Sequence, residues 1–152
     1  PLLPWCSIWI DNDKTNHTGN KNKGAIQIME KLLWVMLGGS LGAAGRYGIS
    51  LLTINLWGTR FPWGTLAVNM TGCFLIGLLF GLSDRTRLLT PEMRLLLITG
   101  FLGALTTFSA FSMETIAAGQ AGMRFQAMMN ILVNNLGGLA LTGLGLWLGT
   151  GD

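Results

Sequence analysis

The chain has 152 residues, of which 50% are hydrophobic and 11% are charged, with a formal net charge of +3. This apolar composition and its positive mean hydropathy exclude an ordinary soluble domain and indicate a single-domain membrane protein. Cys6, Cys73 and His17 are the only cysteines and histidine, so we expect neither a zinc cluster nor a disulfide. No pair of nucleophile and general base is visible, which argues against an enzyme.

The first 28 residues differ in kind from the rest. Asp, Asn and Lys side chains gather between residues 11 and 23, and the short apolar run before them has neither a basic leader nor a small-residue cleavage site. Met29 resembles a natural start. We therefore expect residues 1–28 to be a disordered upstream or artificial extension, and residues 29–152 to form the folded domain.

Four apolar blocks follow, each near the roughly 20 residues that a helix needs to cross about 30 Å of hydrocarbon. The sequence Thr90-Pro91-Glu92 predicts the start of the third, because it combines a hydroxyl cap, a proline in the first turn and an acid at the positive end of the helix dipole. Short connections predict that consecutive helices are antiparallel neighbours. The fold class is therefore an all-α membrane protein with four transmembrane helices, at about residues 32–52, 64–82, 91–118 and 127–148.

Basic residues show little preference for either side of the membrane. The side that holds the termini has more of them than the other side, but the difference is small. Because Lys and Arg orient membrane proteins, this weak bias permits insertion in either direction. The first group comprises Lys31, Arg85, Arg87 and Arg94, and the second comprises Arg60 and Arg124.

Pairs of glycines recur four residues apart in three of the blocks. Helices in a bilayer associate through close backbone packing, which small residues permit. We therefore interpret these glycines as packing positions, within the chain or against a second subunit, in preference to ion contacts. The pairs are Gly38 with Gly42, Gly77 with Gly81, and Gly145 with Gly149.

The third block carries an unusual pattern of hydroxyl side chains among phenylalanines. On a helix with 100° between residues, Phe108 and Phe111 lie about 60° apart, and Ser112 lies about 40° from Phe108. Two interpretations stay open. In the first, the phenylalanines fill space and the serine bonds to its own i−4 carbonyl. In the second, hydroxyl donors and positive ring edges line an anion path.

The segment from Gly103 to Thr107 is poor helix material, because it combines a glycine with two adjacent β-branched residues. We predict that it breaks the third helix near mid-membrane. Non-helical backbone at that depth is tolerated only where protein or a water-filled space surrounds it. The carbonyl oxygens that the break would free suit a small hard cation.

Other polar residues inside the apolar blocks must face protein or water. Arg46 either extends to the membrane interface or attracts anions to an aqueous vestibule. Glu114 either carries protons or pairs with a cation. The remaining members are Asn69, Thr142, Asn130, Asn134 and Asn135, and spacing alone assigns no role to the last three.

Three stretches, "GGSLGAAGRYG", "WGTLAVNMTGCFLIG" and "GFLGALTTFSAFSMET", resemble the CrcB/Fluc family of bacterial fluoride channels. The resemblance extends from about Met29 to the end of the chain. It implies a small protein of the bacterial cytoplasmic (inner) membrane, surrounded by lipid, that pairs antiparallel with an identical copy. The homodimer is then expected to form two pores that export fluoride passively and relieve its toxicity, with no nucleic-acid partner.

The resemblance also implies roles for individual residues. Asn69 matches the family's pore asparagine, and Phe108 and Phe111 match two phenylalanines whose ring edges line the pores. The backbone carbonyls of Gly103 and Thr106 match positions expected to hold a structural sodium ion at the dimer centre. Further candidates for the pore are Ser109, Ser112, Thr142 and Arg46.

Two other functions compete with a channel. One is a small proton-coupled antiporter of four short helices that uses Glu114 as its carrier, although the first block lacks an acid. The other is a purely structural membrane subunit, which explains the glycines but leaves the polar third block without a reason. Fluoride flux that persists without a pH gradient would distinguish a channel from the antiporter.

Overall fold

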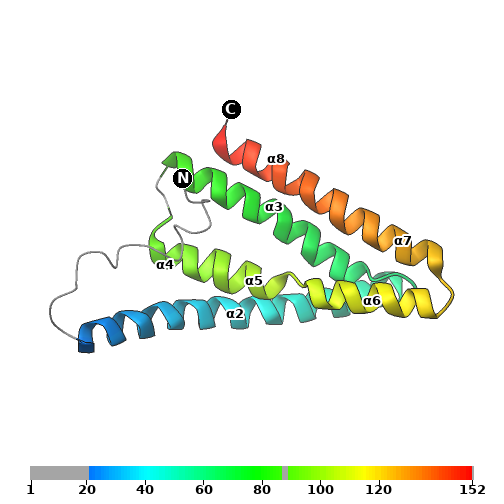
Figure 1. The fold of residues 1–152 in the computed structure, drawn as a ribbon, viewed down its shortest axis with the longest axis horizontal. Helices are drawn as coiled ribbons and strands as arrows, with labels where there is room; N and C mark the ends of the chain where they lie inside the picture. The colour runs from blue at the N-terminus through cyan, green and yellow to red at the C-terminus, as the bar shows by residue number, and fades with distance from the viewer. Residues whose placement is uncertain (1–20, 87–88, 152) are drawn as a thin grey trace.

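The computed structural model describes residues 21–86 and 89–151, and these form four long helical segments with no strand among them (Figure 1). Three segments are long and apolar enough to cross a membrane: Trp63–Ser83, Pro91–Gln120 and Arg124–Thr150. The first segment is not among them, because Lys31, Arg46 and several glycines lower its hydropathy. The protein is therefore an all-helical, multi-pass membrane protein, as the composition predicts.

The first segment, α2 (Lys21–Trp57), is longer than the apolar block from which it was predicted. Its 37 residues correspond to about 55 Å of helix at 1.5 Å per residue. Residues 21–28, which we expected to be disordered, are helical, because no proline interrupts the run into the apolar block. The same expectation for residues 1–20 lies outside the described residues. The helix ends at Trp57 and is followed by Gly58, whose φ of 74° is the left-handed conformation that glycine adopts most readily.

The second segment, α3 (Trp63–Thr86), extends the predicted helix by a few residues at its end. The third comprises α4 (Pro91–Arg94), the π-helix η2 (Leu95–Leu102), α5 (Gly103–Leu105) and α6 (Phe108–Gln120). Its predicted start is confirmed, since the Thr90 hydroxyl accepts a hydrogen bond from the Met93 N–H at 3.3 Å. The fourth comprises α7 (Arg124–Leu132), the π-helix η3 (Val133–Gly137) and α8 (Gly138–Thr150).

The third segment is broken, as predicted, and the break occupies the last two residues of the predicted stretch. Thr106 (φ −78°, ψ 153°) and Thr107 (φ −152°, ψ 113°) are extended. Gly103 remains helical, because the Thr106 N–H still donates to the Leu102 carbonyl at 3.0 Å. The two threonines lie close to the middle of the span Pro91–Gln120.

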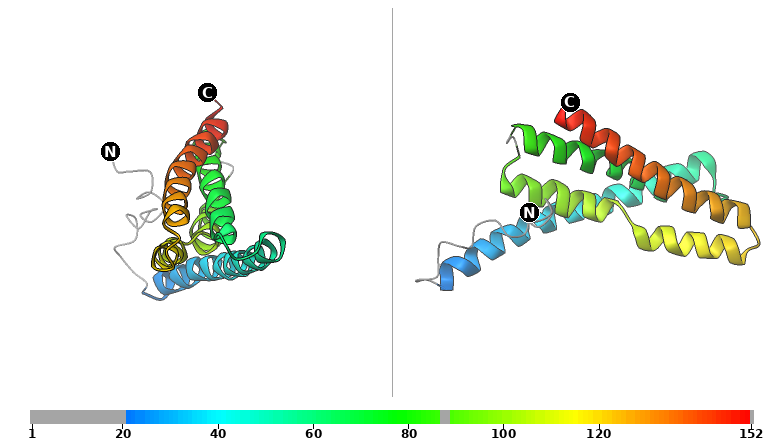
Figure 2. Two further views of the ribbon diagram at one scale, coloured as in Figure 1. Left: turned by 90° about the vertical axis from the view of Figure 1, so that its right-hand side faces the viewer. Right: turned by 45° about the horizontal axis from the view of Figure 1, so that its top comes forward.

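The closest helix contacts join alternate segments. The α2 helix packs along η2 and α5, and α3 packs along α8, as two views show (Figures 1 and 2). Consecutive segments run in opposite directions and also contact one another, α2 with α3 and α6 with α7, as predicted, although these contacts are less extensive. The partner is set by glycines that lie directly against a facing backbone.

The predicted glycine pairs all lie in these two contacts. A Cβ on Gly38 or Gly42 would overlap the carbonyls of Leu96 or Phe101, on the segment facing α2. Between α3 and α8 the arrangement is reciprocal. Gly77 and Gly81 face the carbonyls of Thr142 and Leu146, while Gly145 and Gly149 face those of Phe74 and Leu78.

The two halves of the broken segment have different partners. The first half packs on α2, and its Leu102 and Leu105 join Val68 of α3 in a small buried core. The second half, α6, packs mainly on α7. The break therefore lies between the half of the segment that packs on α2 and the half that packs on α7. Side chains from α3 and η3 lie beside it.

Candidate functional site

A cavity of about 460 Å³ lies beside the break, between α3, the two halves of the third segment and η3. It brings together five of the residues singled out from the sequence, one from the second segment and four from the third. These are Asn69, Gly103, Thr106, Phe108 and Phe111, and Thr107, Asn134 and Asn135 also line the cavity.

Asn69 of α3 completes the backbone of the break. Its Oδ1 accepts a hydrogen bond from the Thr107 N–H at 2.9 Å, and its Nδ2 donates to the Thr107 carbonyl at 3.4 Å. In an unbroken helix the Thr107 N–H would donate to the carbonyl of Gly103. Asn69 therefore provides a partner for a buried N–H group. Without that partner, the unsatisfied donor would destabilise the fold by about 1 to 3 kcal/mol.

The two phenylalanines differ greatly in exposure although they are in contact. The ring centroids of Phe108 and Phe111 are 5.5 Å apart, with the ring planes tilted by 50°. Phe111 is 8% exposed, whereas Phe108 is 77% exposed. Both rings line the cavity beside Asn69, so two aromatic rings and an amide share one lining. Helix geometry predicts that the two phenylalanines share a face, whereas Ser112, which it places on the same face, does not line the cavity.

The hydroxyl candidates mostly bond to their own helices. Ser112 donates to the Phe108 carbonyl at 2.9 Å, which is the i−4 bond of the first interpretation, and Thr142 donates to the Gly138 carbonyl at 2.9 Å. Ser109 differs, since its hydroxyl lies 3.2 Å from that of Thr107. None of Ser109, Ser112 and Thr142 lines the cavity, although Ser109 bonds to a residue that does.

Asparagines of the fourth segment, to which spacing assigned no role, extend the polar site away from the break. Asn69 Nδ2 donates to Asn134 Oδ1 at 3.0 Å, and Asn134 Nδ2 donates to Asn130 Oδ1 at 2.8 Å. Asn130, only 1% exposed, donates to Thr115 Oγ1 at 2.8 Å. The i, i+4 spacing of the two asparagines was the available signal, because it places both on one face of a helix. Asn135 bonds instead to the Ile131 carbonyl at 2.7 Å.

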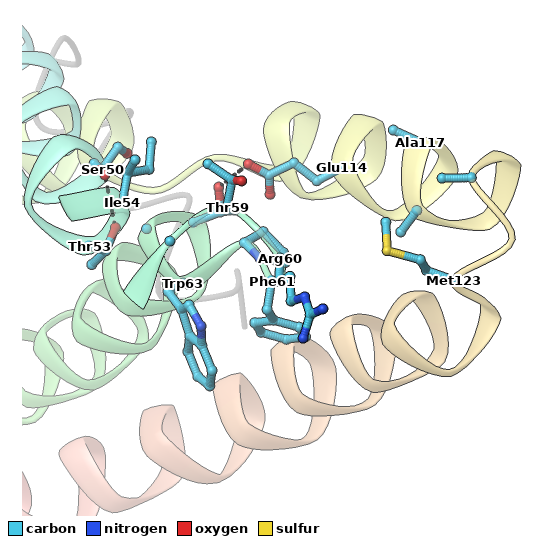
Figure 3. Close-up of a pocket in the computed structure, with 16 residues that line it drawn as sticks. Ser50, Thr53, Ile54, Thr59, Arg60, Phe61, Trp63, Glu114, Ala117 and Met123 are labelled. Atoms are coloured by element: carbon cyan, nitrogen blue, oxygen red, sulfur yellow. Dashed lines mark hydrogen bonds between the residues drawn. The ribbon is translucent and has the colours of Figure 1, made fainter. Parts of the chain in front are cut away.

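A second cavity, of about 430 Å³, lies at the end of the bundle between the α2–α3 connection and α6 (Figure 3). Glu114 points into it and accepts a hydrogen bond on Oε1 from Thr65 Oγ1 at 2.7 Å. Its Oε2 is buried without a partner among the described residues, and the Arg60 guanidinium points away from it. The hydroxyl partner replaces the cation that the pairing interpretation of Glu114 expected. Arg46 lines neither cavity.

Comparison with known proteins places this architecture in a family. Residues 33–146 match the family model described as "CrcB-like protein, Camphor Resistance (CrcB)". A protein of Acidobacterium capsulatum named "Fluoride-specific ion channel FluC" is 48% identical over 119 residues, covering 78% of this chain and 92% of its own. Proteins with the same name from Salinibacter ruber (46% over 119 residues, covering 77% and 87%) and Dehalococcoides mccartyi (44% over 124 residues, covering 80% and 94%) are also similar. The chain belongs to the CrcB-like family.

Proposed function

We propose that the protein is a fluoride-selective channel, not an enzyme, that exports fluoride from the bacterial cytoplasm down its electrochemical gradient. The observation that carries the proposal is the lining of the cavity at the break, where the Asn69 amide and the rings of Phe108 and Phe111 lie together. Support also comes from relatives that are named fluoride-specific ion channels and are 44 to 48% identical to this chain.

The chemistry of this lining suits a small anion. Fluoride holds its hydration water strongly, so a pore must replace that water with other donors. Amide N–H groups and the positive edges of aromatic rings provide such donors. Neither carries a formal charge, so the ion meets favourable contacts that do not trap it, as conduction requires.

The working unit that we infer is a homodimer of two oppositely inserted copies. Phe108 is 77% exposed in the single chain although it is part of a polar site, and Gly103 at the same cavity is exposed as well. A second copy over the cavity would enclose both and turn an open lining into a closed path, with one pore for each lining. The weak Lys/Arg asymmetry of the sequence allows the two orientations that this arrangement needs.

The break also fits the structural sodium ion that the family resemblance implies. Thr106 is extended and the Thr107 N–H donates to Asn69, so the Gly103 carbonyl is released from its helical bond. Gly103 and Thr106 both line the cavity. Their carbonyls, two from each copy, would hold the ion. Bound there, it would supply positive charge between two anion paths, without being transported.

The direct test is ion efflux from liposomes that contain the purified protein. We expect rapid fluoride efflux and far slower chloride efflux, with the potential clamped by a potassium ionophore and with equal pH on both sides. Empty liposomes give the background. Chloride efflux as fast as fluoride efflux would contradict selectivity. Fluoride movement that needs a pH gradient would favour the proton-coupled antiporter with Glu114 as carrier.

A further inference from the structure

The hydrogen bonds around Asn69 form one continuous series that joins three of the four segments. It begins at the Thr107 N–H, passes through the side chains of Asn69, Asn134, Asn130 and Thr115, and ends at the Phe111 carbonyl. Each step is between 2.7 and 3.0 Å. Both ends of the series are backbone groups of the third segment, one at the break and one in α6.

The direction of this series is fixed by backbone groups at three points. The Thr107 N–H can only donate, so the atom of Asn69 that faces it must be Oδ1. The Asn130 carbonyl can only accept, and Asn134 faces it with Nδ2 at 3.0 Å. The Phe111 carbonyl also only accepts, and Thr115 Oγ1 donates to it at 2.7 Å. Along the series, each amide therefore accepts from its neighbour nearer the break and donates to the next member, while Asn69 Nδ2 also keeps its longer, 3.4 Å contact with the Thr107 carbonyl.

We propose that Asn134, Asn130 and Thr115 are positioning residues that hold the Asn69 amide in the orientation needed for anion passage. This inference rests on the proposed function. If the Asn69 amide rotated by 180°, its NH2 group would face the Thr107 N–H and its oxygen would face Asn134. Two donors would then oppose each other at one end and two oxygens at the other. The series makes that rotation unfavourable, so the Asn69 oxygen stays bonded to the Thr107 N–H and the Asn69 nitrogen stays bonded to Asn134. Its contact with the Thr107 carbonyl is long, at 3.4 Å, which leaves that N–H available to an anion in the cavity.

The series also explains why these residue types occupy these positions. Asn134 must accept from Asn69 and donate to Asn130, and a carboxamide does both whereas an ionised carboxylate only accepts. Thr115 must accept from Asn130 while it donates to Phe111, which a hydroxyl does and a methyl group does not. Asn134 lies in the π-helix η3, and such local irregularities are frequent at functional sites.

The test uses Thr115→Val, which keeps the shape of the side chain but removes the hydroxyl, with Thr115→Ser as the matched control that restores it. We expect Thr115→Val to lower fluoride efflux about three- to tenfold, the range that one hydrogen bond of ordinary strength allows. Efflux for Thr115→Ser should stay within about twofold of the unchanged protein. An equal reduction in both variants would overturn the proposal.

A double-variant comparison separates positioning from general stability. In an Asn69→Ser background there is no amide to orient, so adding Thr115→Val should cause no further loss of efflux. A residue that merely stabilises the fold would lower efflux by the same factor in both backgrounds. Losses that multiply would therefore contradict the inference.

A third measurement does not depend on transport. In protein labelled with 15N-asparagine, the side-chain amide resonances of Asn69 are those that disappear in Asn69→Ser. These resonances should shift in Thr115→Val but not in Thr115→Ser. Unshifted resonances would overturn the positioning role, whatever the flux. If the unchanged protein conducts no fluoride while the resonances still shift, the proposed function fails and the hydrogen-bond series stands.

Discussion

Asn69 Oδ1 lies 2.9 Å from the backbone nitrogen of Thr107, so a side chain of the second segment replaces the helical partner that the break removes. The same amide lines the candidate pore. In the proposed channel Asn69 would therefore combine two tasks, one in holding the backbone and one in facing the ion. Substitutions that separate these tasks give the first prediction.

Asn69→Asp and Asn69→Leu should fail in different ways. Aspartate can still accept from the Thr107 N–H, so the protein should fold, but its negative charge should reduce fluoride efflux to near background. Leucine leaves a buried N–H without a partner, which should lower the free energy of unfolding by about 1 to 3 kcal/mol. Thermal unfolding in detergent and liposome efflux measure the two effects. Efflux of Asn69→Asp at the level of the unchanged protein would remove Asn69 from the ion path.

Replacing either phenylalanine of the site by isoleucine tests the role of the ring edges. Isoleucine retains much of the bulk but has no quadrupole, so Phe108→Ile and Phe111→Ile should each reduce fluoride efflux strongly. Phe108 is 77% exposed in the single chain, whereas Phe111 is 8% exposed. Only Phe111→Ile should therefore lower the stability of the chain, by less than about 1.5 kcal/mol. If both variants conduct normally, these rings only fill space.

The contact between α3 and α8 offers a matched pair of glycines. A Cβ on Gly145 would overlap the carbonyl of Phe74, whereas a Cβ on Gly143 would meet nothing within 4 Å. Gly145→Ala should therefore destabilise the fold by about 1 to 3 kcal/mol. Gly143→Ala should be neutral or slightly stabilising, because alanine favours a helix more than glycine does. Thermal unfolding of the two variants measures the difference, and equal melting temperatures would contradict the packing role.

At the break, we expect backbone atoms to matter more than side chains. Thr106→Ser keeps a hydroxyl that can donate to the Leu102 carbonyl, as Thr106 does at 2.9 Å, and should conduct normally. Gly103 has only the Ile98 carbonyl near its Cβ position, at 3.8 Å, so the single chain has room for Gly103→Ile. A loss of dimer in that variant would then arise from crowding between copies. Cross-linking measures the dimer and liposome efflux measures conduction for each variant. Both measurements are repeated after refolding with a larger cation in place of sodium.

Orientation can be tested with charges on exposed positions. Asn55→Lys with Gln120→Lys adds positive charge to one end of the bundle, and Gln27→Lys with Glu30→Lys adds it to the other. Each double variant should insert in one direction and conduct poorly alone, because positive charge stays in the cytoplasm. Co-expression of the two should restore efflux. A singly oriented variant that conducts fully by itself would contradict the antiparallel dimer.

The sequence predicted the elements better than their partners. Elements follow from local signals. The length of an apolar block predicts a membrane-spanning helix, Thr90 caps the start of the third segment, and the adjacent Thr106 and Thr107 lie where that segment breaks. Glycine spacing shows that a helix packs closely but not on which neighbour, so the contact of Gly38 with the Leu96 carbonyl was not predictable. The added turns of α2 were missed because their polar composition gives no membrane signal.

For the site, prediction followed the same division. Phe108 and Phe111 share a face by simple helix geometry, and the cavity contains both. The role of Asn134 depends on how the fourth segment is rotated against α3, and its spacing from Asn130 carries no information on that rotation. Ser112 and Thr142 were candidates for the pore from the sequence but do not line the cavity, and their hydroxyls bond instead to carbonyls of their own helices.

The division of the third segment between two partners has a consequence for the order in which the chain is made. When α6 has just emerged from the ribosome, the first half of this segment already has its main neighbour, α2. The main neighbour of α3 is α8 and that of α6 is α7, and neither α7 nor α8 has been synthesised yet. At that moment Asn69 and Thr107 can already pair with each other, whereas Asn134 does not yet exist. The break is thus stabilised before the fourth segment arrives, and that last segment completes the amide series around a backbone already bent.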